Sequence, residues 1–167
     1  MRTLFISIVV LMSCGASAQN FKNIDVLLES VRLHENRNDL AKADLYKGEY
    51  SYGPLQVRAL TALDVAEYAT SHPEDIHCQS WLVLTAKSGK DFSRPESYIG
   101  EDSISKLAFI IYAKRYATKG RLGRTPTWQD MARIWNRGPN GFEDPTSIKY
   151  WQKVSANLNS VIVTYGY

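Results

Sequence analysis

Apolar residues recur at helical spacing in several segments of this chain, and only one stretch has the character of a β-strand. The helical segments begin near Ile24, Leu60, Asp102 or Ser103, Thr127 and Thr146. The strand-like stretch is residues 50–57, where two tyrosines and a valine lie close to glycines. Residues 76–85 give no clear pattern, but Trp81, Leu82 and Val83 within them are expected to lie in the core. The pattern predicts a single α+β domain that is mainly helical and carries a small β hairpin.

Polar and glycine-rich stretches separate these segments. We expect loops or turns over residues 36–47, 87–100, 120–124 and 136–144. Thr127 followed by Asp130 predicts a capping box at the start of one helix, and Asp102 or Ser103 is expected to cap another. Trp128 and Trp151 fall on apolar helical stripes and are expected to pack in the core.

The amino-terminal segment has the pattern of a signal peptide over residues 1–18. Arg2 provides a positive start, residues 4–12 are apolar, and residues 16–18 form a small-residue cleavage site. The apolar run is too short to serve as a permanent membrane span. Lipidation at Cys14 is an alternative that we consider less favoured. Either route predicts export, so we expect a secreted or periplasmic protein.

Residues 19–167 are enough for one domain with its own core, and we expect a monomer. This part contains one cysteine, Cys78, so an internal disulfide is impossible and packing must stabilise the fold. Without Arg2 the chain has 19 basic and 17 acidic residues, a net charge of +2. That charge is too small to indicate a nucleic-acid partner, although it is compatible with an anionic substrate. No further apolar stretch reaches the length of a stable membrane span.

Histidine, acidic residues and cysteine gather in one short segment, which raises the question of a metal site. The segment contains His72, Glu74, Asp75, His77 and Cys78. Their spacing matches none of the familiar ligand patterns. We therefore expect a polar loop beside a buried cysteine, and neither a metal nor an organic cofactor.

Glu35 is the strongest candidate for a catalytic residue in this sequence. It is expected at the end of the first helix, followed by Gly-Pro-Leu-Gln-Val at residues 53–57 and Ala-Arg-Ile-Trp-Asn-Arg-Gly-Pro at residues 132–139. A carboxyl group at such a junction can be partly desolvated and hold its proton near neutral pH. An acid that breaks a glycosidic bond has this requirement.

These motifs resemble those of the lysozyme-like superfamily, in particular the bacterial lytic transglycosylases and goose-type lysozymes. In those families a helix ends on a catalytic Glu, a Gly-Leu-Met-Gln or Gly-Pro-x-Gln-Ile segment follows, and an Ala-x-Tyr-Asn-x-Gly-Pro motif comes later. A closing Thr-x-x-x-Tyr-x-x-x-Val pattern is matched by Thr146, Tyr150 and Val154. The resemblance covers most of residues 19–167 and implies a lysozyme-like domain with the hairpin beside a substrate cleft.

The resemblance assigns roles residue by residue. Glu35 matches the general acid, Gln56 a glutamine that lines the cleft, Asn136 an asparagine that hydrogen-bonds substrate, and Tyr150 the tyrosine near the acid. Gln56 and Asn136 have an alternative reading, because both side chains could instead satisfy backbone groups in turns. Tyr52 is added with Trp135 as an aromatic candidate for the cleft.

The sequence also departs from the family pattern. Asn36 stands where the family usually has serine after the Glu, and Trp135 stands in place of the motif tyrosine. Arg137 replaces a small residue, which puts charge and bulk near the expected cleft.

Glycoside hydrolysis ordinarily uses a second carboxylate. Glu49 is preferred for this role because it begins the predicted strand, and Asp44 and Asp39 are the alternatives. If none of them faces the cleft, the lytic route remains, in which Glu35 acts as acid and then as base while the substrate's N-acetyl group assists.

The resemblance therefore implies cleavage of the β-1,4 bond between N-acetylmuramic acid and N-acetylglucosamine in peptidoglycan, by a muramidase or a lytic transglycosylase. Two alternatives stay open. One is chitin hydrolysis, since the bond and the acetamido group are shared. The other is a non-catalytic glycan-binding module on the same scaffold, since a fold alone does not fix a function.

Overall fold

The computed structural model describes residues 23–35, 43–46 and 49–165. The α-helices in this part of the chain are α2 (Ile24–Glu35), α3 (Ala59–Ser71), α4 (Ile76–Ser88), α5 (Asp102–Tyr116), α6 (Lys119–Leu122), α7 (Trp128–Arg137) and α8 (Ser147–Tyr165). The strands are β1 (Ala43–Tyr46), β2 (Glu49–Tyr52) and β3 (Val57–Arg58), and a 3-10 helix, η1, spans Pro95–Tyr98. The expected α+β architecture, mainly helical with a small sheet, is confirmed.

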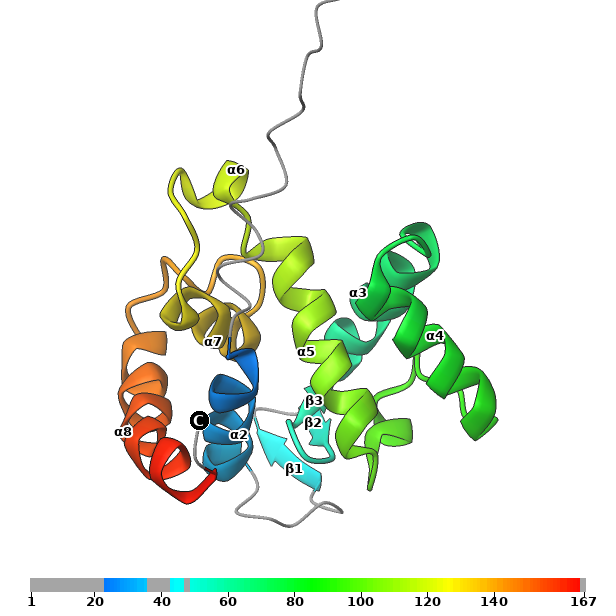
Figure 1. The fold of residues 1–167 in the computed structure, drawn as a ribbon, viewed down its shortest axis with the longest axis horizontal. Helices are drawn as coiled ribbons and strands as arrows, with labels where there is room; N and C mark the ends of the chain where they lie inside the picture. Colours follow the sequence, from blue (N-terminus) through cyan, green and yellow to red (C-terminus); the bar gives the residue numbers. More distant parts are fainter. Residues whose placement is uncertain (1–22, 36–42, 47–48, 166–167) are drawn as a thin grey trace, which may run out of the picture.

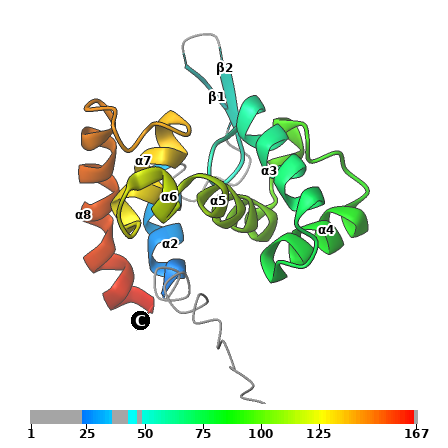
Figure 2. The same cartoon turned by 90° about the horizontal axis from the view of Figure 1, so that it is seen from above.

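Helix α5 lies at the centre of the molecule, between two groups of helices (Figure 1). Helices α2, α7 and α8 pack together on one side, and α3 and α4 pack on the other. Figure 2 shows the β1–β2 pair standing between these groups, at one edge of the molecule. The sheet is antiparallel in the order β1-β2-β3, with Tyr46 opposite Glu49 and Ser51 opposite Arg58.

The predicted strand over residues 50–57 is interrupted. It leaves the sheet after Tyr52, forms a buried turn over residues 53–56, and resumes as β3. Gly53 and Gln56 both have positive φ angles, of 74° and 54°, which reverse the chain. The expected loop over residues 36–47 also needs correction, because residues 43–46 pair with β2.

Gly53 is required by its surroundings as well as by its backbone angle. A Cβ atom at this position would overlap the carbonyl oxygen of Tyr98 in η1. Tyr98 is itself fully buried, and its ring packs edge-on against Phe92. The turn over residues 53–56 therefore packs directly against the segment between α4 and α5.

The helix predictions are confirmed where the apolar period is clear. The ambiguous segment 76–85 belongs to α4, whose N-cap is Asp75, but Val83 is exposed although its neighbour Trp81 is buried. Two further corrections concern short elements: helix α6 overlaps the expected turn over residues 120–124, and the loop over residues 87–100 contains η1.

Helix caps follow the prediction in one case of two. The capping box of Thr127 and Asp130 is present at the start of α7. Helix α5 instead has Glu101 at the N-cap position, without a side-chain cap, so neither Asp102 nor Ser103 is the cap. Asp102 is the first helical residue and pairs with Lys106, one turn later, at 2.9 Å.

The core extends through both helix groups. Its fully buried side chains include Leu27, Leu55, Phe109, Ile111 and Ile134. Trp128 and Trp151 are partly buried and pack against this core, as expected.

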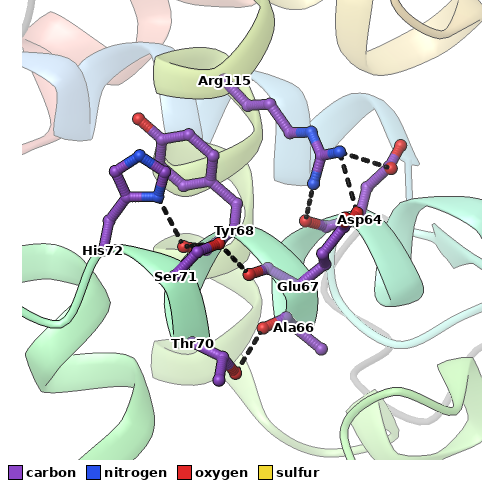
Figure 3. Close-up of polar contacts among 8 residues, drawn as sticks. All are labelled: Asp64, Ala66, Glu67, Tyr68, Thr70, Ser71, His72 and Arg115. Atoms are coloured by element: carbon purple, nitrogen blue, oxygen red, sulfur yellow. Dashed lines mark hydrogen bonds and ion pairs between the residues drawn. The ribbon is translucent and has the colours of Figure 1, made fainter.

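Two sets of ion pairs fasten α5 to its neighbours. Arg115 donates to the backbone oxygen of Asp64 at 2.9 Å and to the Glu67 carboxylate at 2.8 Å, which ties α5 to α3 (Figure 3). Lys106 lies 2.6 Å from the buried carboxylate of Glu29 and so ties α5 to α2. Helix α5 is therefore cross-linked to both groups by charge as well as by apolar packing.

Candidate active site

Glu35 and Tyr150 meet in the structure although 115 positions separate them. Glu35 is the last residue of α2 and is half-buried, and Tyr150 lies near the start of α8 and is 7% exposed. The Tyr150 hydroxyl donates to Oε1 of Glu35 at 2.7 Å. The ring of His34 packs edge-on against the Tyr150 ring, with 5.0 Å between the centroids. Two motifs from opposite ends of the chain thus form one polar contact.

The Tyr150 phenol keeps its proton. Burial is the largest cause that raises its pKa well above the ordinary value, and the neighbouring Glu35 carboxylate raises the pKa further. The positive charge of Arg58 acts in the opposite direction but does not reverse the shift. Tyr150 is therefore a hydrogen-bond donor to Glu35 throughout the neutral range.

Gln56 is buried within its own turn. Its side-chain amide donates to the backbone oxygen of Gly53 at 2.9 Å, and its Oε1 accepts from the Ser51 hydroxyl at 2.8 Å. These bonds link the turn to β2. The geometry therefore shows the turn-supporting contacts that were the alternative reading of Gln56.

Asn136 lies at the carboxyl end of α7, and its backbone oxygen accepts a hydrogen bond from Nη2 of Arg58. The Asn136 side chain is half-buried and makes no hydrogen bond to the part of the chain that the structure describes. It is thus available to a ligand. Arg137 is exposed, and its Nε lies 4.0 Å from Oδ2 of Asp144 in the following turn.

Arg58 is a site residue that the sequence analysis missed. It directly follows the Gly-Pro-Leu-Gln-Val motif, and its guanidinium reaches α7 across 78 positions of sequence. The sequence offered one signal for this residue, a positive charge directly after the motif at residues 53–57. The contact itself depends on the tertiary fold.

Trp135 lies in the core rather than on an exposed wall. It is 6% exposed, its indole N–H donates to the backbone oxygen of Leu55 at 2.9 Å, and its ring packs against Phe109 and Tyr112. Its placement among the cleft residues is therefore corrected: Trp135 ties α7 to the 53–56 turn, and burial leaves it no face for a sugar.

Tyr50 and Tyr52 form an aromatic pair on β2. Residues two apart on a strand share one face, and here the ring centroids are 5.9 Å apart with a tilt of 30°. Tyr50 is 50% exposed, and Tyr52 is half-buried. The pair offers an apolar surface of the kind on which sugar rings stack.

The sequence contains three candidates for the second carboxylate. Asp39 and the side chains of Asp44 and Glu49 lie outside the described residues. For Glu49 the structure gives the backbone alone, which pairs with Tyr46 at the start of β2.

The segment with His72, His77 and Cys78 has a structural role in the described contacts. The Asp75 carboxylate accepts from the backbone N–H groups of His77 and Cys78 and pairs with Lys114 of α5. Cys78 is buried, and burial is the main reason that its thiol pKa rises to about 11. Within the described ranges no group of three or more metal-ligating side chains comes together. The loop between α3 and α4 thus anchors α4 to α5.

None of the helices in the described part of the chain has the length and apolar content that a membrane crossing requires. Comparison with known proteins adds no family: no protein-family model matches the chain, and no curated protein matches it significantly.

Proposed function

We propose that this protein cleaves the β-1,4 bond between N-acetylmuramic acid and N-acetylglucosamine in peptidoglycan, with Glu35 as the general acid, on a lysozyme-like domain. The observation that carries the proposal is the 2.7 Å hydrogen bond from Tyr150 to Glu35. It joins the two residues to which the sequence resemblance assigns the acid and its neighbour. The mainly helical fold with a small sheet is compatible with the same family.

In the proposed reaction, Glu35 gives its proton to the leaving glycosidic oxygen as the bond from that oxygen to C1 breaks. In hydrolysis, water then adds to C1, assisted by a carboxylate such as that of Glu49, Asp44 or Asp39. In the lytic route, the N-acetyl group assists, Glu35 takes a proton back, and the sugar's own hydroxyl closes an anhydro ring. Both routes need the same proton donor.

The other site residues have supporting roles in this proposal. Tyr150 fixes the orientation of the Glu35 carboxyl group, which lowers the entropic cost of reaching the reactive geometry. The exposed ring of Tyr50 and the half-buried ring of Tyr52 support a sugar, and the Asn136 amide hydrogen-bonds to it. Gln56 supports the turn that follows β2 through its bonds to Ser51 and Gly53. We further propose that residues 1–18 direct export, which would bring the enzyme to its polymer.

The test is mass spectrometry of purified peptidoglycan after incubation with residues 19–167 and, in parallel, with Glu35→Gln. The proposal expects products from the wild type and a loss of at least about a hundredfold in rate for the variant. Glu74→Gln is the matched control, because Glu74 is an exposed carboxylate in the loop between α3 and α4. New reducing ends indicate hydrolysis, and anhydro products indicate the lytic route.

Three results would overturn this proposal. Turnover that persists in Glu35→Gln would remove Glu35 from the chemistry. A wild type that cleaves chitin oligomers but not peptidoglycan would change the substrate, and binding without turnover of either polymer would favour the non-catalytic module.

A further inference from the structure

Arg58 has a position that its structural contacts do not explain. It ends β3 and stands at the N-cap position of α3, but its side chain does not cap that helix. It lies directly opposite Ser51 in the antiparallel register, so both residues belong to one face of the sheet. Its guanidinium reaches out from this face to the backbone oxygen of Asn136.

The charge of Arg58 has no carboxylate partner among the described residues. Arg115 and Arg124 show the usual arrangement, since each pairs with a carboxylate at 2.8 Å or less. Arg58 is half-buried, and its recorded hydrogen bond goes to a neutral carbonyl oxygen through one nitrogen. A partly desolvated cation gains from an anionic partner, and a guanidinium has further N–H donors available for one.

Arg58 is also close to the proposed acid. It contacts Asn136, and its charge is felt at the Tyr150 hydroxyl, which donates to Glu35. Arg58 thus lies near Asn136, which is assigned to the substrate, and near Tyr150, which supports the acid. A carboxylate bound here would lie next to the bond that is cleaved. Arginine binds carboxylates well because its planar fork matches their two oxygens.

We propose that Arg58 binds a carboxylate of the substrate beside the scissile bond, so that the site prefers an acidic aminosugar polymer to a neutral one. This inference rests on the proposed function, and it names the chemical feature that separates the two polymers considered there. The carboxylate belongs to muramic acid or to the peptide attached to it. Chitin offers no such group.

The test measures binding instead of turnover, in the full protein with Glu35→Gln. The probes are soluble peptidoglycan strands with free carboxylates and the same strands after amidation of those groups, measured by calorimetry. Adding Arg58→Gln is expected to weaken binding of the acidic strands about tenfold and to leave the amidated strands unchanged. Arg58→Lys keeps the charge and should restore part of the affinity.

Two controls keep the outcome unambiguous. Lys87→Gln removes an exposed positive charge at the end of α4, in the helix group away from α8, and should change neither affinity (Figure 1). If Arg58→Gln fails to fold, as judged by circular dichroism, the salt dependence of binding with Arg58 present replaces it. Added salt should then weaken binding of the acidic strands more than that of the amidated strands.

The inference is wrong if Arg58→Gln weakens both probes equally, because that result would assign Arg58 a structural role alone. It is also wrong if neither affinity changes, or if neither probe binds. Arg58-dependent binding of the acidic strands by a wild type that cleaves nothing would reject the proposed catalysis and retain the carboxylate site. Failure of the one claim is thus distinguishable from failure of the other.

Discussion

The contact between Glu35 and Tyr150 is a hydrogen bond. A substitution of either residue should therefore affect the proposed chemistry strongly. The carboxyl group belongs to the last residue of α2 and is half-buried. The Tyr150 hydroxyl provides a fixed donor at 2.7 Å, and burial keeps that donor protonated. The pair therefore joins a half-buried carboxyl group to a buried phenol that donates to it.

Removing the hydroxyl alone should separate orientation from packing. Tyr150→Phe keeps the ring against His34, so we expect a folded protein with little change in KM. We expect kcat to fall about ten- to a hundredfold, because Glu35 loses a partner that orients it. Initial rates on soluble peptidoglycan strands would measure both constants. An unchanged kcat would show that Tyr150 is not needed to position the acid.

The sequence motifs named Glu35 and Tyr150 as members of one candidate site, and the structure brings their side chains into contact. Their roles stay a prediction, and other candidates were placed less well. Arg58 was missed because its contact with Asn136 spans 78 positions and has no local pattern. Trp135 was named as a cleft residue for its aromatic ring, and an aromatic ring alone does not distinguish a core position from the wall of a cleft. Its indole bond to Leu55 exists only in the folded chain.

Helix α7 begins with a capping box to which an ion pair is added. Asp130 accepts from the Thr127 backbone N–H at 2.8 Å, and both of its oxygens accept from Arg124. Asp130 is fully buried, whereas Arg124 is more than half exposed. Asn136 lies near the carboxyl end of α7. The contacts at the beginning of the helix therefore help to position this candidate site residue.

We expect Asp130→Asn to reduce the free energy of unfolding by about 2 kcal/mol at pH 6, through the lost cap and the lost charged hydrogen bonds. The pKa of Asp130 is lowered by Arg124 and Thr127, which outweigh the opposing effect of burial. A lowered carboxyl pKa stabilises the fold above the ordinary carboxyl value of about 4, and this stability is lost as the pH falls through the folded-state pKa.

The difference between wild type and Asp130→Asn should therefore shrink between pH 6 and pH 2. Urea unfolding at several pH values would measure it. Asp25→Asn, an exposed change in the first turn of α2, should cost less than about 0.5 kcal/mol at any pH. A difference that does not depend on pH would refute the assigned ion pair.

The elements that the sequence predicted are those whose signal is local. Long helices show an apolar period, and a capping box can be recognised from two residues. Strand β1 has no such signal, because its four residues pair through backbone groups that every sequence possesses. Helices α6 and η1 are too short for a period to appear.

Over the whole molecule, α5 packs against both helix groups and also forms ion pairs with each of them. Residues 19–167 contain a single cysteine, so no internal disulfide strengthens either group. The groups should therefore unfold together and not one after the other.

Equilibrium unfolding of residues 19–167 in urea provides the measurement. Circular dichroism reports on all helices, and tryptophan fluorescence reports on both groups, since Trp81 lies in α4 and Trp135 in α7. We expect the two transitions to share one midpoint, with or without a reducing agent. Separate midpoints would show that α3 and α4 form an independently unfolding unit.

The close approach of Gly53 to Tyr98 has a consequence for how this chain can be altered. Surface connections between helices usually accept insertions and deletions at little cost. Residues 89–101 join α4 to α5 but also support the turn that contains Gln56. Changing the length of this connection would shift the turn, so a protein engineer should graft new sequence elsewhere, for example at the exposed glycine of the turn after α6.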